Sequence, residues 1–298
     1  GGITLYPGHA PRRHRATPVR VVRDLRDANG IDAVLLAVKN YSLEPVAQSI
    51  RDALDSNTLV VGLQNGVENQ EILPRCFTKV IYGIVGYNAW VDKPGVVGFQ
   101  KRGPLVLGTP DNSLKEDMDG LVTVLGTGVK TVIADRLQDA AHSKLVLNLA
   151  NSLTTLSGHT YQEPSAPELL QTLLSNVLME GIEIVRAAGY REWHIGGMPS
   201  WRLIRASATL PQWLTRPLFR RNLRKMVRSS MAQDVIGHRR QDTELESING
   251  YLLRLAEKHG VHAPYNRALH EICREEFPKP DFRPLDTIDL WRRMLATF

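Results

Sequence analysis

Three short apolar runs near the start of the chain alternate with segments of helical spacing. The runs DAVLLAVK, TLVVGL and KVIYGIV, at residues 32–39, 58–63 and 79–85, consist mainly of aliphatic and β-branched residues. Such runs are typical of strands that are covered on both faces. Apolar side chains repeat at helical spacing over residues 41–54, and residues 67–77 also resemble a helix. Strands and helices that alternate in this way build right-handed βαβ units, so the sequence predicts a doubly wound parallel sheet.

Further strands are predicted on both sides of these units. Residues 2–6 and 19–23 have the composition of short strands, and residues 129–134 that of a last strand. Residues 95–108 combine β-branched residues with Gly and Pro turns, which favours a hairpin. The first part of the chain is therefore predicted to be of the α/β class.

From residue 137 to the end, the spacing of apolar residues is helical only. This change places the domain boundary near residue 136, with an α/β domain over residues 1–135 and an all-α domain over residues 136–298. Helices are predicted over residues 138–156, 166–188, 216–237, 244–259, 266–277 and 286–298.

One predicted helix, AHSKLVLNLANSLTTLSG at residues 141–158, is apolar on nearly all sides except along one narrow polar seam. Lys144, Asn148 and Asn151 share that seam because they lie at positions i, i+4 and i+7. A helix of this kind is normally buried, so the ammonium and the two amides need partners. Two interpretations stay open. The lysine can reach water while the asparagines link neighbouring helices, or the three donors bind a small ligand that carries a carbonyl and a carboxylate.

Polar residues follow two of the predicted parallel strands. Lys39 and Asn40 come after the first apolar run, and Gln64 and Asn65 come after the second. In open α/β sheets the ligand lies beyond the carboxyl ends of the strands. Polar residues at these places are also common turn formers, and an Asn-Gly pair is especially so. The sequence therefore leaves both a ligand contact and a simple turn open for them.

The overall composition, with 43% hydrophobic and 23% charged residues, is that of an ordinary globular protein. No apolar run approaches the roughly 18 residues that span a bilayer, and the N-terminal stretch GGITLYPGHAPRRHR lacks the apolar core of a signal peptide. A soluble, cytoplasmic protein without membrane contact is expected. Cys76 and Cys273 belong to no C-x-x-C or Cys/His cluster, so buried, reduced thiols are predicted and a metal site is not.

The net charge of +6 raises the question of an anionic partner. A basic helix face is either solvated or attracts anionic substrates and cofactor phosphates. Nucleic acid is not expected as a partner, because no RNP-like, helix-turn-helix or zinc-finger pattern accompanies the charge. The excess lies in Arg12, Arg13 and Arg15, and in Arg216, Arg220, Arg224 and Arg228, which recur every four residues and would share one helix face.

Four segments together carry a resemblance to a known family. They are VLLAVKNY (34–41), VVGLQNGVEN (60–69), SKLVLNLANSLTTL (143–156), and SSMAQD (229–234) followed by TELESINGYLLRLAEKHGVHAPYN (243–266). In this order they resemble the ketopantoate reductase (2-dehydropantoate 2-reductase) family over about residues 32–266. The resemblance implies a Rossmann-like dinucleotide-binding domain, then an all-α domain for substrate binding and dimerisation. The implied reaction is the NADPH-dependent reduction of a small 2-keto acid, and the implied assembly is a homodimer through the helical domain.

The resemblance also implies roles for individual residues of the second domain. Lys144 matches the catalytic lysine, and Glu244 matches the acid that approaches both this lysine and the cofactor. Asn148 and Asn151 match substrate-binding asparagines, and Ser230 matches the serine that binds the substrate carboxylate. Hydride transfer places negative charge on the carbonyl oxygen, and a protonated lysine there stabilises that charge and supplies the proton.

In the first domain, Lys39 and Ala89 match positions that line the NADP site. Asn65 matches the asparagine near both the nicotinamide and the substrate. The chain departs from the family at its start, because no G-x-G-x-x-G turn follows a first strand. Its glycine-rich candidates, Gly1-Gly2 and the stretch 126–130, do not connect a strand to a helix start. A fragment of a longer reading frame, or a variant that has lost dinucleotide binding, is therefore expected.

Several alternatives stay open beside the reductase interpretation. Glu244 follows Thr243, a good N-cap residue, and acids near a helix start are common for electrostatic reasons alone. Ser230 could be an ordinary helical serine, and Tyr161 stands where some members have a further substrate asparagine. The whole chain could be a non-catalytic homologue that uses its helical domain for dimerisation or ligand sensing. It could also be a related hydroxyacid dehydrogenase with another substrate.

Overall fold

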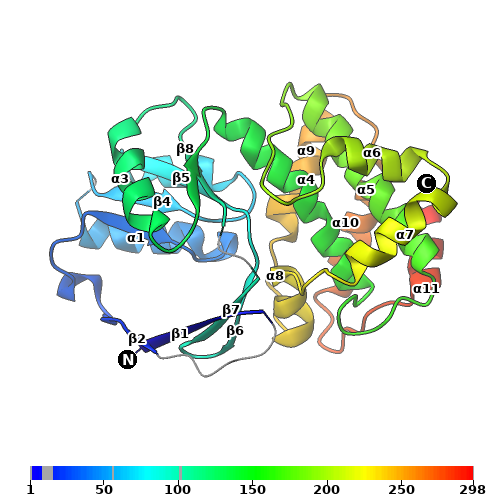
Figure 1. Cartoon of the computed structure of the whole chain (residues 1–298), viewed down its shortest axis with the longest axis horizontal. Helices are drawn as coiled ribbons and strands as arrows, with labels where there is room; N and C mark the ends of the chain where they lie inside the picture. Colours follow the sequence, from blue (N-terminus) through cyan, green and yellow to red (C-terminus); the bar gives the residue numbers. More distant parts are fainter. Residues whose placement is uncertain (1, 9–15, 56, 101–102, 298) are drawn as a thin grey trace. The chain divides into compact units, whose positions relative to one another are not determined.

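The protein divides into two compact units, Gly1–Ala140 and Ala141–Phe298. The computed structural model describes residues 2–8, 16–55, 57–100 and 103–297. The first unit is of the α/β class and the second is built of helices, so the predicted fold class is confirmed (Figure 1). Among the described residues, no helix is long and apolar enough to cross a membrane.

The larger sheet of the first unit has the strand order β3-β4-β5-β8-β9. Strands β3, β4 and β5 run parallel, as predicted, whereas β8 and β9 are parallel to each other and antiparallel to β5. Every residue of β4 is buried, because the sheet is covered on both faces. The bounds are β3 Ala33–Leu36, β4 Leu59–Gly62, β5 Val80–Val85, β8 Leu105–Gly108 and β9 Thr131–Ile133.

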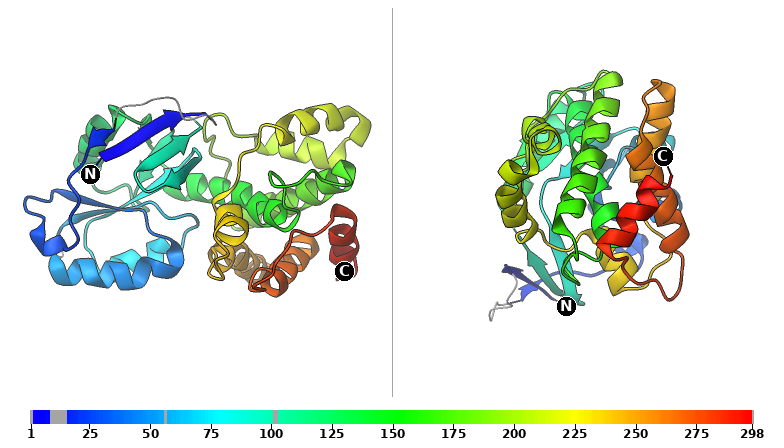
Figure 2. Two further views of the ribbon diagram at one scale, coloured as in Figure 1. Left: turned by 90° about the horizontal axis from the view of Figure 1, so that it is seen from below. Right: turned by 90° about the vertical axis from the view of Figure 1, so that its right-hand side faces the viewer.

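Helices cover both faces of this sheet. Met118 and Leu121 of α3 pack against the face that carries Val61 and Ile81. Figure 2 shows α1 on the opposite face of the sheet. The helical segments of this unit are the 3-10 turns η1 Leu25–Asp27 and η2 Asn40–Ser42, then α1 Leu43–Ala53, α2 Asn69–Ile72 with the 3-10 turn η3 Leu73–Arg75, and α3 Lys115–Gly126.

A second, smaller sheet has the order β2-β1-β7-β6 and corrects two predictions. Residues 95–108 do not form a hairpin. The turn at Pro94-Gly95 joins β6 to β7, and β8 pairs with β5 of the larger sheet instead. Residues 19–23 form no strand either, because the pairing with β1 lies at Thr17-Pro18. The bounds are β1 Gly2–Pro7, β2 Thr17–Pro18, β6 Ala89–Lys93 and β7 Val96–Phe99.

A polar and aromatic cluster holds the smaller sheet together. The Trp90 indole nitrogen donates to the Tyr6 hydroxyl at 3.0 Å, and that hydroxyl donates to the Asp92 carboxylate. The Trp90 ring lies over Gly98 of the neighbouring strand, where a Cβ atom would approach the ring to 2.4 Å. Glycine is therefore needed at position 98 because the ring occupies the space of a side chain.

The second unit is organised around helix α5. This helix packs against α6, α7, α9, α10 and α11 (Figure 2). Its apolar core includes Leu145, Leu149 and Leu153 of α4, which are fully buried. Cys273 is also buried here and Cys76 is buried in the first unit, and both are free thiols as predicted. The helices are α4 Leu137–Leu156, α5 Pro167–Ala187, α6 Trp201–Thr209, α7 Gln212–Leu223, α8 Ser230–Ala232, the π-helices η4 Gln233–Gly237 and η5 Glu246–Gly250, α9 Tyr251–Lys258, α10 Pro264–Glu276 and α11 Thr287–Leu295.

The predicted helix over residues 216–237 is wrong, and so is the basic face built on it. Helix α7 ends at Leu223, and a new helical start follows at Ser230, where Ser229 caps α8. Arg216 and Arg220 both pair with Glu168 of α5, so they serve packing between helices. Arg224 ends α7 and Arg228 lies beyond it. The other predicted basic cluster, at residues 12, 13 and 15, lies outside the described residues.

Two helices, α3 and α6, are not predicted by the spacing of apolar residues. In α3, Gly120 lies mid-helix, where glycine is unfavourable by about 1 kcal/mol relative to alanine, and the preceding Leu114 has φ of 56° and provides no side-chain cap. Helix α6 follows a Gly- and Pro-containing loop and has only Trp201 and Ile204 buried. Packing against the rest of each unit, rather than the local pattern, defines these two helices.

Candidate functional site

Three predicted site residues of the first unit follow the carboxyl ends of three neighbouring parallel strands. Leu36 of β3 lies opposite Gly62 of β4, and Gly62 lies opposite Tyr82 of β5. Carboxyl ends of adjacent parallel strands meet at one edge of a sheet. Lys39 therefore follows β3 at this edge, Asn65 follows β4, and Ala89 comes shortly after β5.

Side-chain amides tie the first two of these strand ends together. Gln64 is buried, and its amide nitrogen donates to the carbonyl oxygens of Leu36 at 2.8 Å and of Val38 at 3.1 Å. The amide of Asn40 donates to the carbonyl oxygen of Asn65 at 2.5 Å. Asn69, at the start of α2, donates to the Gln64 side-chain oxygen at 3.3 Å. The loop after β3 and the loop after β4 thus form one connected polar surface.

This network assigns different tasks to the polar residues at the strand ends. Gln64 and Asn40 bind the backbone of the neighbouring loop, so they hold the edge in shape. Gly66, with φ of 86°, makes the turn that follows Asn65, as the Asn-Gly pair predicts. Lys39 and Asn65 are both half-buried beside this turn. Ala89 begins β6 in the smaller sheet and is exposed.

In the second unit, the polar seam of α4 is buried to different depths along the helix. Asn148 is only 5% exposed, while Lys144 and Asn151 are half-buried. The apolar positions between them, such as Leu145 and Leu149, have no exposed surface. The predicted burial of this helix is confirmed, and Lys144 and Asn151 of the seam are among its few half-buried positions.

Polar contacts on its buried sides fix the orientation of α4. The His142 ring stacks on the Tyr190 ring with centroids 3.7 Å apart, and its Nε2 lies 2.9 Å from the Tyr251 hydroxyl. The Ser143 hydroxyl accepts from the backbone nitrogen of Trp193 at 2.8 Å. Such contacts immediately before Lys144 restrict rotation of the helix, so the direction of the seam is set by the fold.

The seam continues to Ser152, where three elements of the second unit meet. The Ser152 hydroxyl donates to the Asn249 side-chain oxygen at 2.6 Å and lies 3.5 Å from the Met231 sulfur. Met231 belongs to α8, and Asn249 belongs to the π-helix η5. The segment with Ser230 and the segment that follows Glu244 are therefore both attached to α4 at the end of its seam.

Glu244 is a buried carboxylate, with 4% of its surface exposed. Thr243 beside it does not cap the helix, because its hydroxyl accepts only from the backbone nitrogen of Leu245 at 3.3 Å, two residues on, and η5 begins without a side-chain cap. The π-helix η5 follows at once, and π turns are frequent at functional sites. Burial distinguishes Glu244 from an exposed acid placed only for the helix dipole.

The two neighbouring serines at the start of α8 have separate environments. The Ser229 hydroxyl accepts from the backbone nitrogen of Ala232 at 3.1 Å and so caps the helix. Ser230 is the first residue of α8 and is half-buried. The Tyr161 hydroxyl donates to the Ala232 carbonyl oxygen at 3.4 Å, and the Arg228 guanidinium lies 4.6 Å from the centre of the Tyr161 ring. Tyr161 thus lies against the segment that contains Ser230.

Sequence reasoning missed the residues that support the seam. His142 and Ser143 precede Lys144 in the same motif, and their polar types within a buried helix were the signal that could have found them. Ser152 lies at i+8 from Lys144, on the same side of the helix. Asn249 carries no local signal, because its partner Ser152 is 97 residues away in the sequence.

The residues at the carboxyl edge fit part of a nicotinamide dinucleotide. The Lys39 ammonium suits a phosphate or ribose oxygen, and the Asn65 amide suits a carboxamide. A pyrophosphate is usually held by a glycine-rich turn at a helix start. Within the described residues, the loops after β3 and β4 hold one glycine, Gly66, and contain no G-x-G-x-x-G turn. Gly126, at the end of α3, lies on the wrong side of a helix for this purpose.

An α/β unit with polar residues after its parallel strands, followed by a helical unit with a Lys/Asn seam, is the organisation of nicotinamide-dependent dehydrogenases that act on small oxygenated acids. The comparisons with known proteins agree with this class. The model of the family described as "Ketopantoate reductase PanE/ApbA" matches residues 2–112, and the one described as "Ketopantoate reductase PanE/ApbA C terminal" matches residues 136–276. The chain belongs to the ketopantoate reductase family, which consists of NAD(P)-dependent oxidoreductases.

Individual relatives agree with this assignment. A 2-dehydropantoate 2-reductase of Archaeoglobus fulgidus is 26% identical over 249 residues, which cover 82% of this chain and 76% of the relative. The crystal structure of a PanE/ApbA family ketopantoate reductase from Ralstonia eutropha JMP134 matches with a TM-score of 0.68 and 25% identity, over 94% of this chain and 86% of that one.

Two further solved structures have the same fold. A dimeric ketopantoate reductase from Staphylococcus aureus matches with a TM-score of 0.65 and 19% identity, over 94% of this chain and 87% of that one. A D-mandelate dehydrogenase with NADH and anilino(oxo)acetate matches with a TM-score of 0.67 and 20% identity, over 85% of this chain and 78% of that one.

Proposed function

We propose that this chain catalyses the NADPH-dependent reduction of a small 2-keto acid, 2-dehydropantoate, to the 2-hydroxy acid. The observation that carries the proposal is the buried α4 helix, in which Lys144 and Asn151 are half-buried and Asn148 is buried along one polar seam. The family membership supports it across both units. We assign dinucleotide binding to residues 1–135 and substrate binding to residues 136–298, and we expect the enzyme to act in the cytoplasm.

Reduction of the 2-keto acid requires a proton donor at the ketone oxygen. NADPH, when bound, supplies the hydride to the carbonyl carbon. Lys144 donates a hydrogen bond to the carbonyl oxygen and then its proton, which contributes about 10²- to 10⁴-fold as general acid catalysis. Glu244 is the carboxylate that keeps Lys144 charged, since a neighbouring negative charge favours the ammonium form against the effect of burial.

The remaining residues of the proposed site hold substrate oxygens. Asn148 and Asn151 donate amide hydrogen bonds to the substrate, and Ser230 donates its hydroxyl to the substrate carboxylate. Lys39, Asn65 and Ala89 contact the dinucleotide, with Asn65 near the reacting carbonyl as well. We infer NADP rather than NAD from the family, with Lys39 as the cation nearest the strand ends.

The experiment is an assay of the purified chain with NADPH and each of three acids, namely 2-dehydropantoate, phenylglyoxylate and pyruvate. The proposal expects turnover with 2-dehydropantoate at a kcat/KM at least tenfold above that of the other two. A higher kcat/KM with phenylglyoxylate would favour a relative of the D-mandelate dehydrogenase. Absence of turnover, together with no change of Tm in NADPH, would favour a non-catalytic homologue.

We further propose that the helical unit forms a homodimer through α6 and α7. These helices expose an unusual number of large apolar side chains for a monomer surface, and a second copy would cover them. Trp213 is 73% exposed. A Trp213→Asp variant should elute as a monomer in size-exclusion chromatography with light scattering, whereas a Val124→Asp variant on α3 should not change the mass. The exposed apolar residues are Leu203, Leu210, Trp213, Leu214 and Leu218.

A further inference from the structure

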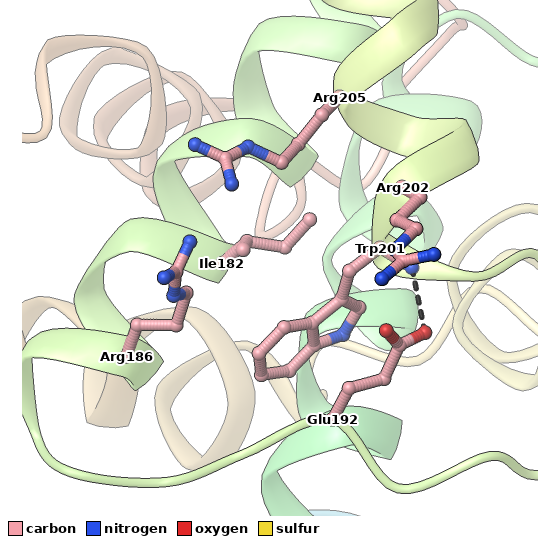
Figure 3. A pocket seen from close by; sticks show the side chains of 6 residues that line it. All are labelled: Ile182, Arg186, Glu192, Trp201, Arg202 and Arg205. Carbon is pink, nitrogen blue, oxygen red and sulfur yellow. Dashed lines mark hydrogen bonds between the residues drawn. The ribbon is translucent and has the colours of Figure 1, made fainter.

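A pocket formed by α5, α6 and the loop between them is lined by no residue assigned to the reductase site. Its volume is about 240 Å³. It belongs entirely to the second unit, and none of its residues lies on α4, α8 or η5. Figure 3 shows the side chains that line it, which are Ile182, Arg186, Glu192, Trp201, Arg202 and Arg205.

Three of the six lining side chains are guanidinium groups. Figure 3 shows Arg186 and Arg205 on one side of the pocket, on either side of Ile182, and Arg202 on the other side with Glu192. Within the described part of the chain, no carboxylate forms an ion pair with any of these three arginines. Arginine stays charged at all ordinary pH values, so the pocket carries three fixed positive charges against a single acid.

The single acid in the pocket already has a structural task. The Glu192 carboxylate accepts a hydrogen bond from the backbone nitrogen of Trp201 at 2.7 Å (Figure 3). Trp201 is the first residue of α6, so Glu192 stabilises the start of this helix. Arg186 and Arg205 are exposed, and no ion pair joins either of them to an acid in the part of the chain that the structure describes.

The floor of the pocket is apolar and buried. Trp201 and Ile182 are both buried members of the helical core. An indole next to two guanidinium groups suits a ligand that combines an anionic head with a short planar or apolar body. Arginine pairs with phosphate oxygens through two parallel hydrogen bonds, and two such groups match the charge of a phosphate monoester.

We propose that this pocket is a binding site for a small organic phosphate, separate from the reductase site. Arg186 and Arg205 bind the phosphate oxygens, Arg202 adds long-range attraction, and Trp201 and Ile182 contact the organic part. The site has no part in hydride transfer, because its elements carry none of the residues assigned to that chemistry.

The test is isothermal titration of the whole chain, in chloride buffer, with inorganic phosphate and with phenyl phosphate. An Arg186→Gln/Arg205→Gln variant should lose at least tenfold in affinity for both probes, whereas Arg202→Gln should lose less. The matched control is Arg221→Gln/Arg224→Gln, which removes two exposed charges from the same unit and should change affinity less than twofold. Phenyl phosphate should bind more tightly than inorganic phosphate because its ring contacts Trp201.

Each contrary outcome overturns a defined part of the proposal. Equal affinity in the Arg186→Gln/Arg205→Gln variant and in the wild type would place the phosphate elsewhere, for example at the dinucleotide site. An equal loss in the control variant would reduce the effect to net charge. If phenyl phosphate bound no better than inorganic phosphate, the pocket would not recognise an organic body.

Discussion

The two polar regions of this protein, one in each unit, are built in different ways. At the carboxyl edge of β3 and β4, side-chain amides bind backbone carbonyl groups of the adjacent loop, as Gln64 does with Leu36 and Val38. Along α4, the supporting contacts join side chains from distant elements, as Ser152 does with Asn249. The first region is therefore fixed by contacts between two successive strand-end loops, whereas the second depends on the packing of a whole helical unit.

The largest expected effect on catalysis is that of a substitution at Lys144. In a Lys144→Ala variant we expect kcat for 2-keto acid reduction to fall by about 10²- to 10⁴-fold, because the carbonyl oxygen loses its proton donor. The Tm should change little, since Lys144 is half-buried. Steady-state kinetics and a thermal melt measure both quantities. A Lys258→Ala variant, altered at an exposed residue of α9, is the control, and a Lys144→Ala enzyme that kept most of its kcat would remove Lys144 from the chemistry.

Substitution of a polar residue at the carboxyl edge of the sheet should lower the stability of the protein rather than the rate of catalysis. A Gln64→Leu variant removes the hydrogen bonds to the Val38 carbonyl group and the Asn69 amide, and one of the two bonds to the Leu36 carbonyl group, which keeps its bond from the Leu63 nitrogen. We therefore expect a loss of about 1 to 3 kcal/mol in the free energy of unfolding. Denaturant titration measures it. Gln48→Leu, at an exposed position of α1, should stay within about 0.5 kcal/mol of the wild type. If Gln64→Leu were equally neutral, the edge would not depend on this amide.

Glu180 is a second buried acid of the helical unit, and it lies outside the proposed reductase site. Its carboxylate accepts from the backbone nitrogens of Tyr265 at 2.9 Å and of Asn266 at 2.8 Å, at the start of α10. Burial raises the pKa of Glu180 above its ordinary value, in spite of these hydrogen bonds. We therefore interpret Glu180 as a residue that stabilises the fold, in contrast to Glu244.

The pH dependence follows from the direction of this pKa shift. The folded protein holds the Glu180 proton more tightly than the unfolded chain, so this contribution to stability is full at low pH. It is lost as the pH rises from about 4.5 through the raised pKa of the folded state. The stability difference between the wild type and Glu180→Gln should therefore shrink with rising pH. Chemical denaturation at several pH values measures it, and a difference that grows with pH would contradict the assignment.

The smallest expected effects are those of substituting the two serines at the start of α8, and they should differ between the two residues. Ser229→Ala removes the helix cap, so we expect a loss of about 0.5 kcal/mol in stability with an unchanged KM for the keto acid. Ser230→Ala should leave the Tm unchanged and raise KM, because Ser230 is proposed to bind the substrate carboxylate. Thermal melts and steady-state kinetics of both variants measure these effects. If KM rose only in Ser229→Ala, Ser229 rather than Ser230 would bind the substrate carboxylate.

The same contrast explains what could be predicted from the sequence. Strands β3, β4 and β5 and the polar residues after them are visible locally, because each buried strand and its turn lie within a few residues. The polar seam of α4 is visible for the same reason, through the spacing of Lys144, Asn148 and Asn151. The error over residues 216–237 arose because arginines at a four-residue spacing continue past Leu223, although the helix does not.

The remaining errors also have physical causes. Residues 95–108 contain two strands, but each pairs with a partner outside that range, and partner choice depends on the whole sheet. Helices α3 and α6 are defined by the surfaces that they cover. The support of the α4 seam by Asn249 depends on a pairing of residues that are distant in the chain, so no local pattern could indicate it.

The π-helix η5 has a consequence for how this protein tolerates insertions and deletions. Its i→i+5 hydrogen bonds take up about one residue more per turn than an α-helix does, so the five residues 246–250 turn the chain by nearly the angle that four α-helical residues would. Removing one residue within 246–250 would let this turn wind as an α-helix, while the chain on either side kept nearly its direction. Removing one residue within α9 would instead rotate the chain before the deletion by about 100° relative to the chain after it. A one-residue deletion is thus expected to be tolerated better in η5 than in α9.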